Sequence, residues 1–466
     1  MQNAEIKMQN AEISAKCRNK CRMQKGIVFM QAVIMAGGKG TRLLELTQDE
    51  LPKPMIPING KPVLEWQIEC LYRNGITDIC IIIGHLGETI QEYFGDGSKF
   101  NVSICYYKEE IPMGTAGALA HIGFFLKDDY FLLVYGDVIF DIDTNRMECF
   151  HKQKKAAATL FVHPNSHPFD SDLVILDENN RITGFDSKKN VRSYWYSNMV
   201  NAGFYIISKA ICDELLENSK IDLEHEILFG RCGKDSDIYG YVSTEYIKDA
   251  GTIDRVDRVS NDLRNGVVAA KNLSKPQQCV FLDRDGTVNK HIGLLSKPGQ
   301  LELEDKAAEA LKKLNTSKYL AVLITNQPVV ARGLCSIDDV EEIHKKLQTV
   351  LGENHVYLDD LFYCPHHPDK GFPEENPIYK IDCECRKPKP GLMQTAAVKH
   401  HIDLTKSWFI GDTTVDIKAG KNAGTRTVLV KTGQAGEDKK YDVTPDYTAE
   451  NILDAVEYIL SYRDED

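Results

Sequence analysis

Two segments with the signatures of phosphate chemistry lie far apart in this chain, each directly after a short, mostly apolar run. Residues 36–43 read Ala-Gly-Gly-Lys-Gly-Thr-Arg-Leu after the run 31–35, and residues 51–54 read Leu-Pro-Lys-Pro. Residues 283–287 read Asp-Arg-Asp-Gly-Thr after the run 279–282. A glycine loop presents backbone N–H groups to phosphates, and a strand-end aspartate can attack a phosphate ester. Because each signature needs a strand that ends at a sheet edge, the pair predicts two α/β units.

Short β-rich runs alternate with helical patterns along most of the chain. The apolar runs that predict strands lie at 31–35, 79–83, 130–135, 280–282, 320–324, 408–410 and 427–430. Apolar residues at helical spacing predict a helix over 60–74. This alternation is typical of the α/β class with largely parallel sheets, so we expect Rossmann-like units of three layers.

A polar, proline-containing stretch interrupts this pattern between the two signatures. It spans 271–278 and predicts a linker over 266–278, between a first domain at 30–265 and a second at 279–466. Residues 1–29 are polar and repeat Met-Gln-Asn-Ala-Glu-Ile, so we expect a disordered extension there.

The composition excludes some classes of function. The formal net charge of −12 argues against a broad nucleic-acid surface. No segment reaches the roughly 18 apolar residues that cross a bilayer. Thirteen cysteines, an odd number in a long chain, favour reduced thiols and a cytoplasmic protein. We therefore expect small anionic ligands, and neither nucleic acid nor a membrane as a partner.

The glycine loop predicts a nucleotide site. Gly37, Gly38 and Gly40 allow the backbone to approach phosphate closely, and Arg42 and Lys53 would bring positive charge to a triphosphate. A lone glycine-rich turn is more often an ordinary tight loop. The arginine and the Pro-Lys-Pro segment at fixed distance favour the nucleotide interpretation.

In these features the chain resembles the sugar-1-phosphate nucleotidylyltransferases, which have a GT-A-like fold. Their motif combines the glycine loop, Thr41 and Arg42 with the later Pro-Lys-Pro segment, and the resemblance spans about residues 31–265. Further matching segments lie at 113–117, 136–137, 185–188, 201–203 and 249–252. The segments Pro-Lys-Pro-Met-Ile-Pro and Gly-Lys-Pro make the mannose- and heptose-type guanylyltransferases the closest likeness, which implies GTP as the nucleotide.

The resemblance also implies roles for individual residues. Asp137 and Asp249 would hold Mg²⁺, and Lys188 would contact the sugar phosphate. Nucleotide or sugar contacts are implied at Gly114, Thr115 and Asn201. The implied reaction is a direct displacement, in which a sugar 1-phosphate oxygen attacks the α-phosphorus and pyrophosphate leaves. Catalysis would then consist of positioning and of charge neutralisation by Mg²⁺, Arg42 and Lys53.

The second signature predicts covalent phosphoryl transfer. Asp283 would attack phosphorus, and Asp285, two residues on, would protonate the leaving alcohol and then activate water. A lone pair of strand-end aspartates is a weak signal, because such residues also cap helices. Here three of the four predicted strands of the second domain end directly before polar residues, which places one site across three strand tips.

Together these residues resemble the haloacid dehalogenase (HAD) superfamily over about residues 278–462. The resemblance implies Asp283 as the nucleophile and Asp285 as the acid and base, with Thr325 and Lys387 binding phosphate. Asn326 and Arg386, beside these two, are further candidate substrate contacts. Mg²⁺ would be held by Asp412 together with Asp283 and Asp285.

A cysteine and histidine cluster lies within the second domain. Cys364 and His366 form one tight pair, Cys383 and Cys385 form another, and 16 residues separate the two pairs. Thiolate and imidazole in this spacing fit a tetrahedral, structural zinc site, while free thiols on a loop are the alternative. The spacing resembles the zinc loop of the D-glycero-D-manno-heptose 1,7-bisphosphate 7-phosphatases and the related histidinol-phosphate phosphatases.

The two resemblances together imply consecutive steps of one pathway. A heptose bisphosphate phosphatase releases heptose 1-phosphate, which a sugar-1-phosphate nucleotidylyltransferase would consume. We therefore expect a bifunctional enzyme that makes a nucleotide-activated heptose, GDP-linked, for lipopolysaccharide or another surface polysaccharide. One alternative is a mannose or hexose 1-phosphate nucleotidylyltransferase fused to a histidinol-phosphate-type phosphatase. The other, of a different class, is a regulatory protein that binds a sugar nucleotide.

Overall fold

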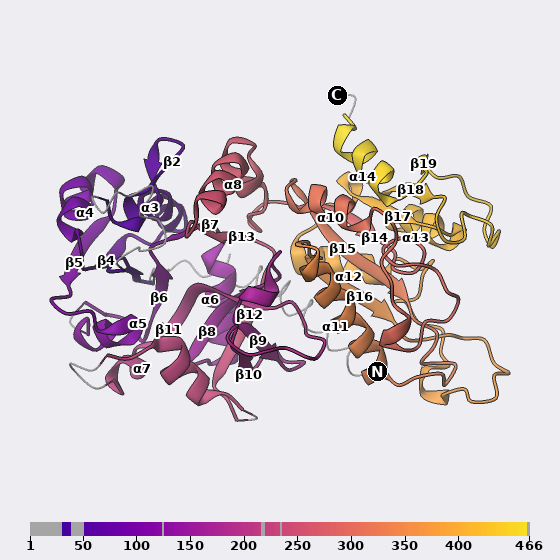
Figure 1. Cartoon of the computed structure of the whole chain (residues 1–466), viewed down its shortest axis with the longest axis horizontal. Helices are drawn as coiled ribbons and strands as arrows, with labels where there is room; N and C mark the ends of the chain where they lie inside the picture. The colour runs from indigo at the N-terminus through magenta and orange to yellow at the C-terminus, as the bar shows by residue number, and fades with distance from the viewer. Residues whose placement is uncertain (1–29, 39–50, 124, 216–219, 234, 464–466) are drawn as a thin grey trace.

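A computed structural model describes residues 30–38, 51–123, 125–215, 220–233 and 235–463. The predicted extension 1–29 lies outside these residues, as do Gly40, Thr41 and Arg42 of the glycine loop. Two α/β units lie side by side (Figure 1). We call residues 30–270 the N-terminal module and residues 278–461 the C-terminal module. The predicted α/β class is confirmed in both.

The N-terminal module is built on a nine-stranded sheet. Seven strands follow the order β10-β9-β11-β6-β1-β4-β5, and β8 and β12 lie off this path. The strands β6, β1, β4 and β5 are parallel, while β11 joins β6 in antiparallel fashion. The nine strands are β1 (Ala32–Met35), β4 (Asp78–Ile83), β5 (Ser103–Lys108), β6 (Tyr130–Tyr135), β8 (Ala158–His163), β9 (Leu173–Leu176), β10 (Ile182–Asp186), β11 (Val200–Ser208) and β12 (Ile238–Val242).

Both faces of this sheet are covered, because alternate strand residues point to opposite sides. Ala32, Ile34 and their neighbours pack with the apolar faces of helices α3 (Val63–Arg73), α4 (Gly87–Phe94) and α6 (Thr144–Lys154). Val33 and its neighbours pack on the other side with α5 (Gly114–Gly117), α7 (Lys209–Asp213) and the 223–228 turn. The predicted helix over 60–74 corresponds to α3.

Two small sheets and two further helices complete the module. The strands are β2 (Pro57–Ile58), β3 (Lys61–Pro62), β7 (Val138–Asp141) and β13 (Tyr246–Asp249), and the helices are α8 (Ile253–Arg264) and α9 (Val267–Ala270). Val267 and Val268 of α9 are buried in a cluster with Ile58 and Val63. The predicted linker 266–278 therefore begins with a helix that packs on the N-terminal module, and the domain limits stay a prediction.

The C-terminal module has a six-stranded, fully parallel sheet in the order β16-β15-β14-β17-β18-β19. Its strands are β14 (Gln278–Leu282), β15 (Tyr319–Asn326), β16 (Asp360–Cys364), β17 (Trp408–Gly411), β18 (Arg426–Val430) and β19 (Tyr447–Ala449). Its helices are α10 (Ala307–Asn315), α11 (Ile337–Glu353), α12 (Gly391–His400), α13 (Thr414–Ala423) and α14 (Ile452–Ser461). One face of the sheet packs on α10, α11 and α14, and the other on α12 and α13.

The two modules contact each other through hydrogen bonds as well as through the chain that connects them. The Tyr196 amide donates to Thr349 Oγ1 at 3.0 Å, and the Asn198 amide donates to Gln348 Oε1 at 2.8 Å. Arg146 Nη2 donates to the carbonyl of residue 399 at 3.0 Å. A loop of the N-terminal module thus contacts α11, and helix α6 contacts the end of α12.

No helix in the described part of the chain combines the length and the apolar character that crossing a bilayer requires. Ten cysteines of the described ranges carry free thiols, whereas Cys149 takes part in a disulfide.

Candidate active sites

The first candidate site lies where β6 ends and the small antiparallel sheet begins. Asp137 directly precedes β7, and β13 pairs with β7 so that Asp249 lies opposite Val138. The Ala250 amide donates to the Asp137 carbonyl at 2.7 Å, which closes this pairing. Two aspartates more than 100 residues apart in sequence are therefore neighbours, as a shared metal site would require.

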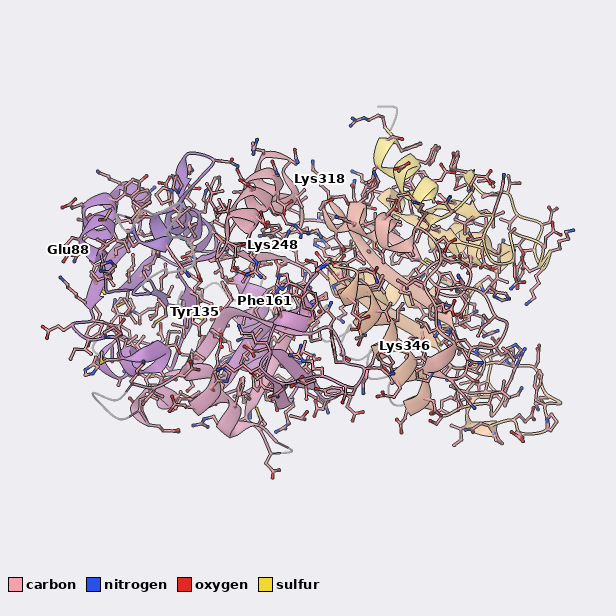
Figure 2. The ribbon with its side chains drawn as sticks, in the orientation of Figure 1. Glu88, Tyr135, Phe161, Lys248, Lys318 and Lys346 are labelled. Atoms are coloured by element: carbon pink, nitrogen blue, oxygen red, sulfur yellow. The ribbon has the colours of Figure 1, made fainter. Side chains whose placement is uncertain are left out.

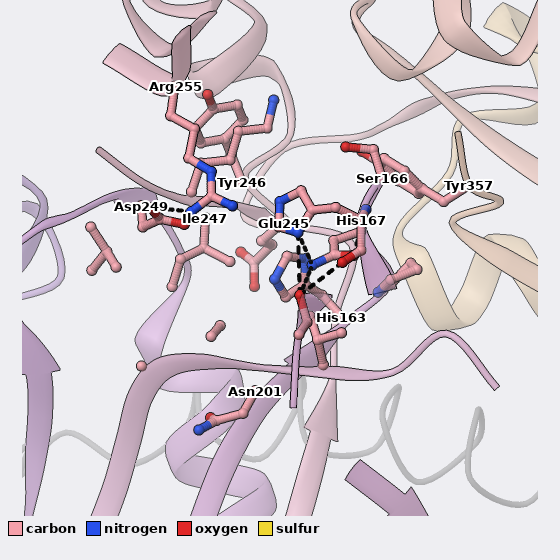
Figure 3. A pocket seen from close by; sticks show the side chains of 18 of the residues that line it. His163, Ser166, His167, Asn201, Glu245, Tyr246, Ile247, Asp249, Arg255 and Tyr357 are labelled. Carbon is pink, nitrogen blue, oxygen red and sulfur yellow. Dashed lines mark hydrogen bonds and ion pairs between the residues drawn. The ribbon is translucent and has the colours of Figure 1, made fainter. Parts of the chain in front are cut away.

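Each of these two carboxylates faces a cation. Lys53 Nζ lies 3.5 Å from Asp137 Oδ2, and Arg255 Nη1 donates to Asp249 at 2.7 Å (Figure 3). Asp137 and Asp249 line a cavity of about 370 Å³, together with Lys188 and Asn201. Four of the residues predicted from the sequence therefore line one cavity. Lys53 does not line it but contacts Asp137, which does.

A buried polar network forms the floor of this cavity. Glu224 accepts hydrogen bonds from Asn201 Nδ2 at 2.7 Å, from Tyr135 at 3.2 Å and from the Tyr205 hydroxyl. Burial raises the pKa of Glu224. A bulge in β11 turns Asn201 toward it, and Gly203 at φ 72° lets that strand pass the Tyr135 ring.

The glycine residues predicted for phosphate binding lie in two places. Gly37 and Gly38 directly follow β1 at the carboxyl edge of the sheet, before the residues that are not described. Gly114 adopts φ 76° at the start of α5, and Thr115 Oγ1 accepts from the Leu223 amide at 2.8 Å. In this structure, Thr115 therefore holds the 223–228 turn in place.

The second candidate site is a buried cluster of three carboxylates at the carboxyl edge of the C-terminal sheet. Asp283 follows β14, Asp412 follows β17, and Asp416 belongs to the first turn of α13, which Thr413 caps. Their carboxylate oxygens lie within 4.8 Å of one another. Lys387 Nζ contacts Asp283 at 2.5 Å and Asp416 at 2.7 Å, so one buried ammonium group partly offsets three negative charges.

The electrostatics of this cluster favour protonation. Burial, followed by the charge of Asp416, raises the pKa of Asp283 to about 7 and that of Asp412 to about 9. Burial alone would lower the pKa of Lys387, but Asp283 and Asp416 raise it above its usual value. Asp412 Oδ1 is buried without a hydrogen-bond partner among the described residues. Three convergent carboxylates and an unpartnered oxygen are the environment that a divalent cation fits.

The Asp285 side chain lies outside this carboxylate group, although the sequence placed it among the Mg²⁺ ligands. Arg284 Nη2 donates to both of its oxygens, at 3.0 and 2.9 Å, and Gln327 Nε2 donates at 3.0 Å. Burial would raise the pKa of Asp285, but the charge of Arg284 and these hydrogen bonds hold it below the usual range. Asp416 takes the third position in the group, because the first turn of α13 points it at Lys387.

The other predicted phosphatase residues lie beside the cluster. Thr325 ends up buried next to Gln327, whose Nε2 donates to Thr325 Oγ1 at 2.9 Å. The Asn326 side chain brackets the Lys387 backbone, donating to its carbonyl and accepting from its amide. Arg386 turns away from the carboxylates and donates to the carbonyl of residue 366 at 3.0 Å.

Four soft ligand atoms converge beside this site. The side chains of Cys364, His366, Cys383 and Cys385 bring their ligand atoms within 4.8 Å of one another. The cysteines are free thiols, and His366 Nδ1 faces Cys385 Sγ at 3.4 Å. Three thiols and one imidazole, mostly buried and not joined as disulfides, fit a tetrahedral zinc ion. Lys387 follows Cys385 by two residues, so the cluster anchors the segment that carries it.

Several residues that the structure places at the two candidate sites were not among the site residues predicted from the sequence. Asp416 and Gln327 belong to segments that resemble the HAD superfamily, but neither was given a role, although Asp416 lies one helical turn after Asp412. Arg255 and Arg258 follow Asp249 on α8 and line the first cavity, as does Tyr357 from the C-terminal module. Only spacing along α8 could have indicated the two arginines, and no sequence signal could have indicated Tyr357.

Comparisons with known proteins agree with this geometry. A family model described as nucleotidyl transferase matches residues 31–266, which is half of the chain. A second, described as HAD-hydrolase-like, matches residues 384–455. The chain belongs to the nucleotidyl transferase and HAD-like phosphatase families. Both matched segments contain candidate site residues, Asp137 and Asp249 in the first and Lys387 and Asp412 in the second.

Curated relatives match each part of this two-family enzyme separately. A D-glycero-beta-D-manno-heptose-1,7-bisphosphate 7-phosphatase of Pasteurella multocida is 40% identical over 190 residues, 40% of this chain and 99% of the relative. A mannose-1-phosphate guanylyltransferase of Mycobacterium tuberculosis is 32% identical over 246 residues, 52% of this chain and 67% of the relative. A UTP--glucose-1-phosphate uridylyltransferase of Synechocystis is 35% identical over 207 residues, 42% of this chain and 53% of the relative.

Proposed function

We propose that this enzyme catalyses two consecutive steps of nucleotide-activated heptose synthesis. Its phosphatase, within 279–466, removes the 7-phosphate of D-glycero-D-manno-heptose 1,7-bisphosphate. Its transferase, within 30–265, then joins a nucleotidyl group to heptose 1-phosphate and releases pyrophosphate. The pairing of the two modules carries this proposal, because the product of one reaction is a substrate of the other. The full-length likeness to the Pasteurella phosphatase supports the sugar.

In the transferase, the chain supplies position and charge rather than a nucleophile. Lys188 would hold the sugar 1-phosphate, whose oxygen attacks the α-phosphorus while the bond to pyrophosphate breaks. Arg42 and Lys53 would neutralise the charge that builds up on the leaving pyrophosphate. Glu224 and Asn201, at the cavity floor, would orient the sugar hydroxyls. Asp137 and Asp249 would bind Mg²⁺, which supplies charge neutralisation at the phosphates when bound.

In the phosphatase, Asp283 would attack the phosphorus of the 7-phosphate. The phosphorus–oxygen bond to the sugar breaks, and the sugar oxygen takes up a proton from Asp285. Water then attacks the aspartyl phosphate while Asp285 removes its proton, and inorganic phosphate leaves with Asp283 restored. Arg284 holds Asp285 ionised in this structure, which is the state required of the base in the second step. For the first step Asp285 must therefore take up a proton from water when the substrate binds.

We further propose two kinds of resident metal in the phosphatase. Mg²⁺ fits Asp283, Asp412 and Asp416, where it would offset the negative charge that now raises their pKa values. Zinc fits Cys364, His366, Cys383 and Cys385, which fill all four positions of a structural site. Zinc there would fix the loop that presents Arg386 and Lys387.

GTP is the proposed nucleotide, with the guanylyltransferase of Mycobacterium tuberculosis in support. The uridylyltransferase of Synechocystis makes UTP the competing candidate. A transferase for mannose or another hexose 1-phosphate is the alternative for the sugar. It is less favoured, because the phosphatase would then make no product that the transferase uses.

One reaction tests the proposal. Purified protein is incubated with heptose 1,7-bisphosphate, Mg²⁺ and all four nucleoside triphosphates, and products are identified by mass spectrometry. A GDP-heptose peak is the expected result. Heptose 1-phosphate without a nucleotide sugar would reject the transferase assignment, and intact bisphosphate would reject the heptose assignment altogether.

A further inference from the structure

The transferase cavity continues to the border between the two modules, where its wall is cationic. We call Ser166, Arg258, Lys271 and Tyr357 the junction subsite. Arg258 comes from α8, Lys271 directly follows α9, and Tyr357 belongs to the C-terminal module; all four line the same cavity as Asp137 and Asp249. Figure 3 shows Tyr357 reaching from the C-terminal module toward the cavity wall that carries Ser166 and His167.

Lys271 is a buried cation whose ion pair with Asp359 is long. Its side chain is 5% exposed, and its Nζ lies 3.9 Å from Asp359 Oδ1. The other oxygen of Asp359 accepts from the Ala321 amide at 2.8 Å. Burial would lower the pKa of Lys271, yet the charge of Asp359 keeps it above the usual value, so the ammonium group stays charged. Within the described residues this ammonium group makes no hydrogen bond.

Arg258 is left without a counter-charge. Its only hydrogen bond in the described part of the chain joins Nη1 to Ser166 Oγ at 3.5 Å, and its buried Nε has no partner. The Tyr357 hydroxyl has no partner among the described residues. Thr244, which is 5% exposed and lines the same cavity, has an unpartnered Oγ1. Donors therefore accumulate at this end of the cavity.

The neighbouring acidic groups are committed elsewhere. Asp262 pairs with Lys248 at 2.7 Å and accepts from the Tyr246 hydroxyl at 2.8 Å. Glu245 accepts from the backbone amides of residues 143 and 273. Figure 2 shows Lys248 close to the border of the modules as well. Asp359, which also lines the cavity, is the carboxylate that pairs with Lys271, at 3.9 Å. Because buried cations are costly without an anion, Arg258 without a counter-charge and Lys271 with only a long ion pair point to an anionic ligand.

The subsite lies within reach of a ligand that is held at the aspartates. Arg255, which contacts Asp249, and Arg258 are three residues apart on α8, so their side chains are neighbours about 5–6 Å apart at their Cβ atoms. A sugar whose 1-phosphate lies near Asp249 and Lys188 would point its far end toward Arg258 and Tyr357. A phosphate on that far end would meet two cations and two or three hydroxyl groups.

We propose that the junction subsite binds a phosphate monoester at the far end of the sugar, so that the transferase cavity holds the sugar bisphosphate more tightly than the sugar 1-phosphate. This inference rests on the proposed function. The bisphosphate would then compete with heptose 1-phosphate for the transferase cavity for as long as the phosphatase has not consumed it. Tyr357 makes the C-terminal module part of the transferase cavity.

The test uses the full chain with Asp283→Asn, which leaves the bisphosphate intact. Pyrophosphate release is followed with GTP, Mg²⁺ and heptose 1-phosphate, and heptose 1,7-bisphosphate is added as a competitor. We expect a Ki for the bisphosphate about tenfold below the KM of the 1-phosphate, the gain typical of a charge-assisted contact. Should the bisphosphate itself react, its KM takes the place of Ki.

Variants locate the effect. Adding Arg258→Gln should raise the Ki of the bisphosphate about tenfold and leave the KM of the 1-phosphate within about twofold. Tyr357→Phe removes only a hydroxyl group and should raise that Ki about threefold. Arg264→Gln is the matched control, because Arg264 lies on the same helix and, within the described ranges, forms hydrogen bonds only with Ser260. The proposal would be overturned if the bisphosphate and the 1-phosphate bound with equal affinity. It would also be overturned if Arg258→Gln, Tyr357→Phe and Arg264→Gln raised the Ki of the bisphosphate by the same factor.

A second measurement does not depend on the sugar. Crystals of the full chain are soaked in selenate, a phosphate analogue, and anomalous peaks are compared between wild type and Arg258→Gln. A peak between Arg258, Lys271 and Tyr357 that the variant lacks is expected. No peak there would reject the anion subsite itself. If selenate binds but the bisphosphate binds no more tightly than the 1-phosphate, the subsite binds an anion other than the far phosphate of the sugar, and the proposal is wrong. A transferase that is inactive on heptose 1-phosphate would instead reject the proposed function.

Discussion

The two candidate sites handle negative charge in opposite ways. In the C-terminal module, three carboxylates and Lys387 are buried together, and the pKa of Asp283 rises to about 7. In the N-terminal module, Asp137 and Asp249 face separate cations on the wall of an open cavity. A site whose own carboxylate forms the new bond needs room for little more than one phosphate group and a water molecule, whereas a site that aligns two charged substrates must leave room for both. The contrast follows from where the nucleophile comes from.

The sites also differ in their relation to the C-terminal sheet. Asp283 and Asp412 follow strands at its carboxyl edge, while Tyr357 and Asp359 precede β16 at its amino edge and line the transferase cavity. Strands β14 and β15, which run between these edges, have five and eight residues, or roughly 15–25 Å of length. Under the proposed function, a heptose 1-phosphate released at one edge of the sheet has to reach a cavity at the opposite edge.

The largest expected effect comes from Asp283→Asn. Without the nucleophile, phosphate release from heptose 1,7-bisphosphate should fall by at least about 10³-fold, as for other covalent catalysts that lose their nucleophile. Nucleotidyl transfer from added heptose 1-phosphate should stay at the wild-type rate, because the sites lie at different edges of the sheet. Separate assays of phosphate and pyrophosphate measure the two activities.

Asp338→Asn is the matched control, since Asp338 is exposed at the start of α11. If Asp283→Asn abolished both activities while Asp338→Asn abolished neither, the two sites would not be independent, and the comparison would fail.

Asp137→Asn should produce the reverse pattern. It removes one charge from the corner where Asp137 and Asp249 meet, so nucleotidyl transfer should fall about 10²- to 10³-fold, as when a preorganised electrostatic contact is lost. Phosphate release should not change. Asp257→Asn, on the exposed side of α8, provides the control. Transfer at the wild-type rate would show that Asp137 does not bind the metal.

The cysteine cluster should have an intermediate effect that is confined to one module. Wild-type protein should contain one zinc per chain by elemental analysis, and Cys383→Ser should lose it. Phosphate release should then fall about 10- to 100-fold, because the loop no longer presents Lys387, while transfer is retained. Cys335→Ser changes a half-buried thiol outside the cluster and should alter neither activity. Zinc bound equally by Cys383→Ser would contradict the assignment.

The sequence predicted those parts of each site that are encoded by contiguous motifs. Asp283, Lys387 and Asp412 come together because each follows a strand or a loop with a recognisable pattern, and parallel strands end at one edge. Asp416 was outside the predicted ligand set, because only the helical turn of α13 brings it to Lys387. Tyr357 could not be predicted, since its place depends on how one module docks on the other, which local patterns do not encode.

The smallest effect concerns Glu245, a buried carboxylate that belongs to neither catalytic group. It accepts from the backbone amides of residues 143 and 273 and so ties the N-terminal module to the chain that leads into the next. Burial raises its pKa to about 7; the two backbone hydrogen bonds and the charge of Arg146 oppose this rise, and the charge of Asp143 adds to it. Its ordinary pKa is 4.5. Because the folded state binds this proton more tightly, stability should fall as pH rises from about 4.5 to about 7 and then level off.

Glu245→Gln should remove this dependence, since the amide oxygen can still accept from both backbone amides. At pH 8 the variant should be more stable than wild type by up to about 3 kcal/mol, and at pH 4.5 the two should be equal. Urea midpoints across this range measure the difference, with Glu309→Gln on the surface of α10 as the control. A variant that is less stable than wild type at pH 8 would show that the ionised Glu245 carboxylate stabilises the fold, and the predicted rise in its pKa would be wrong.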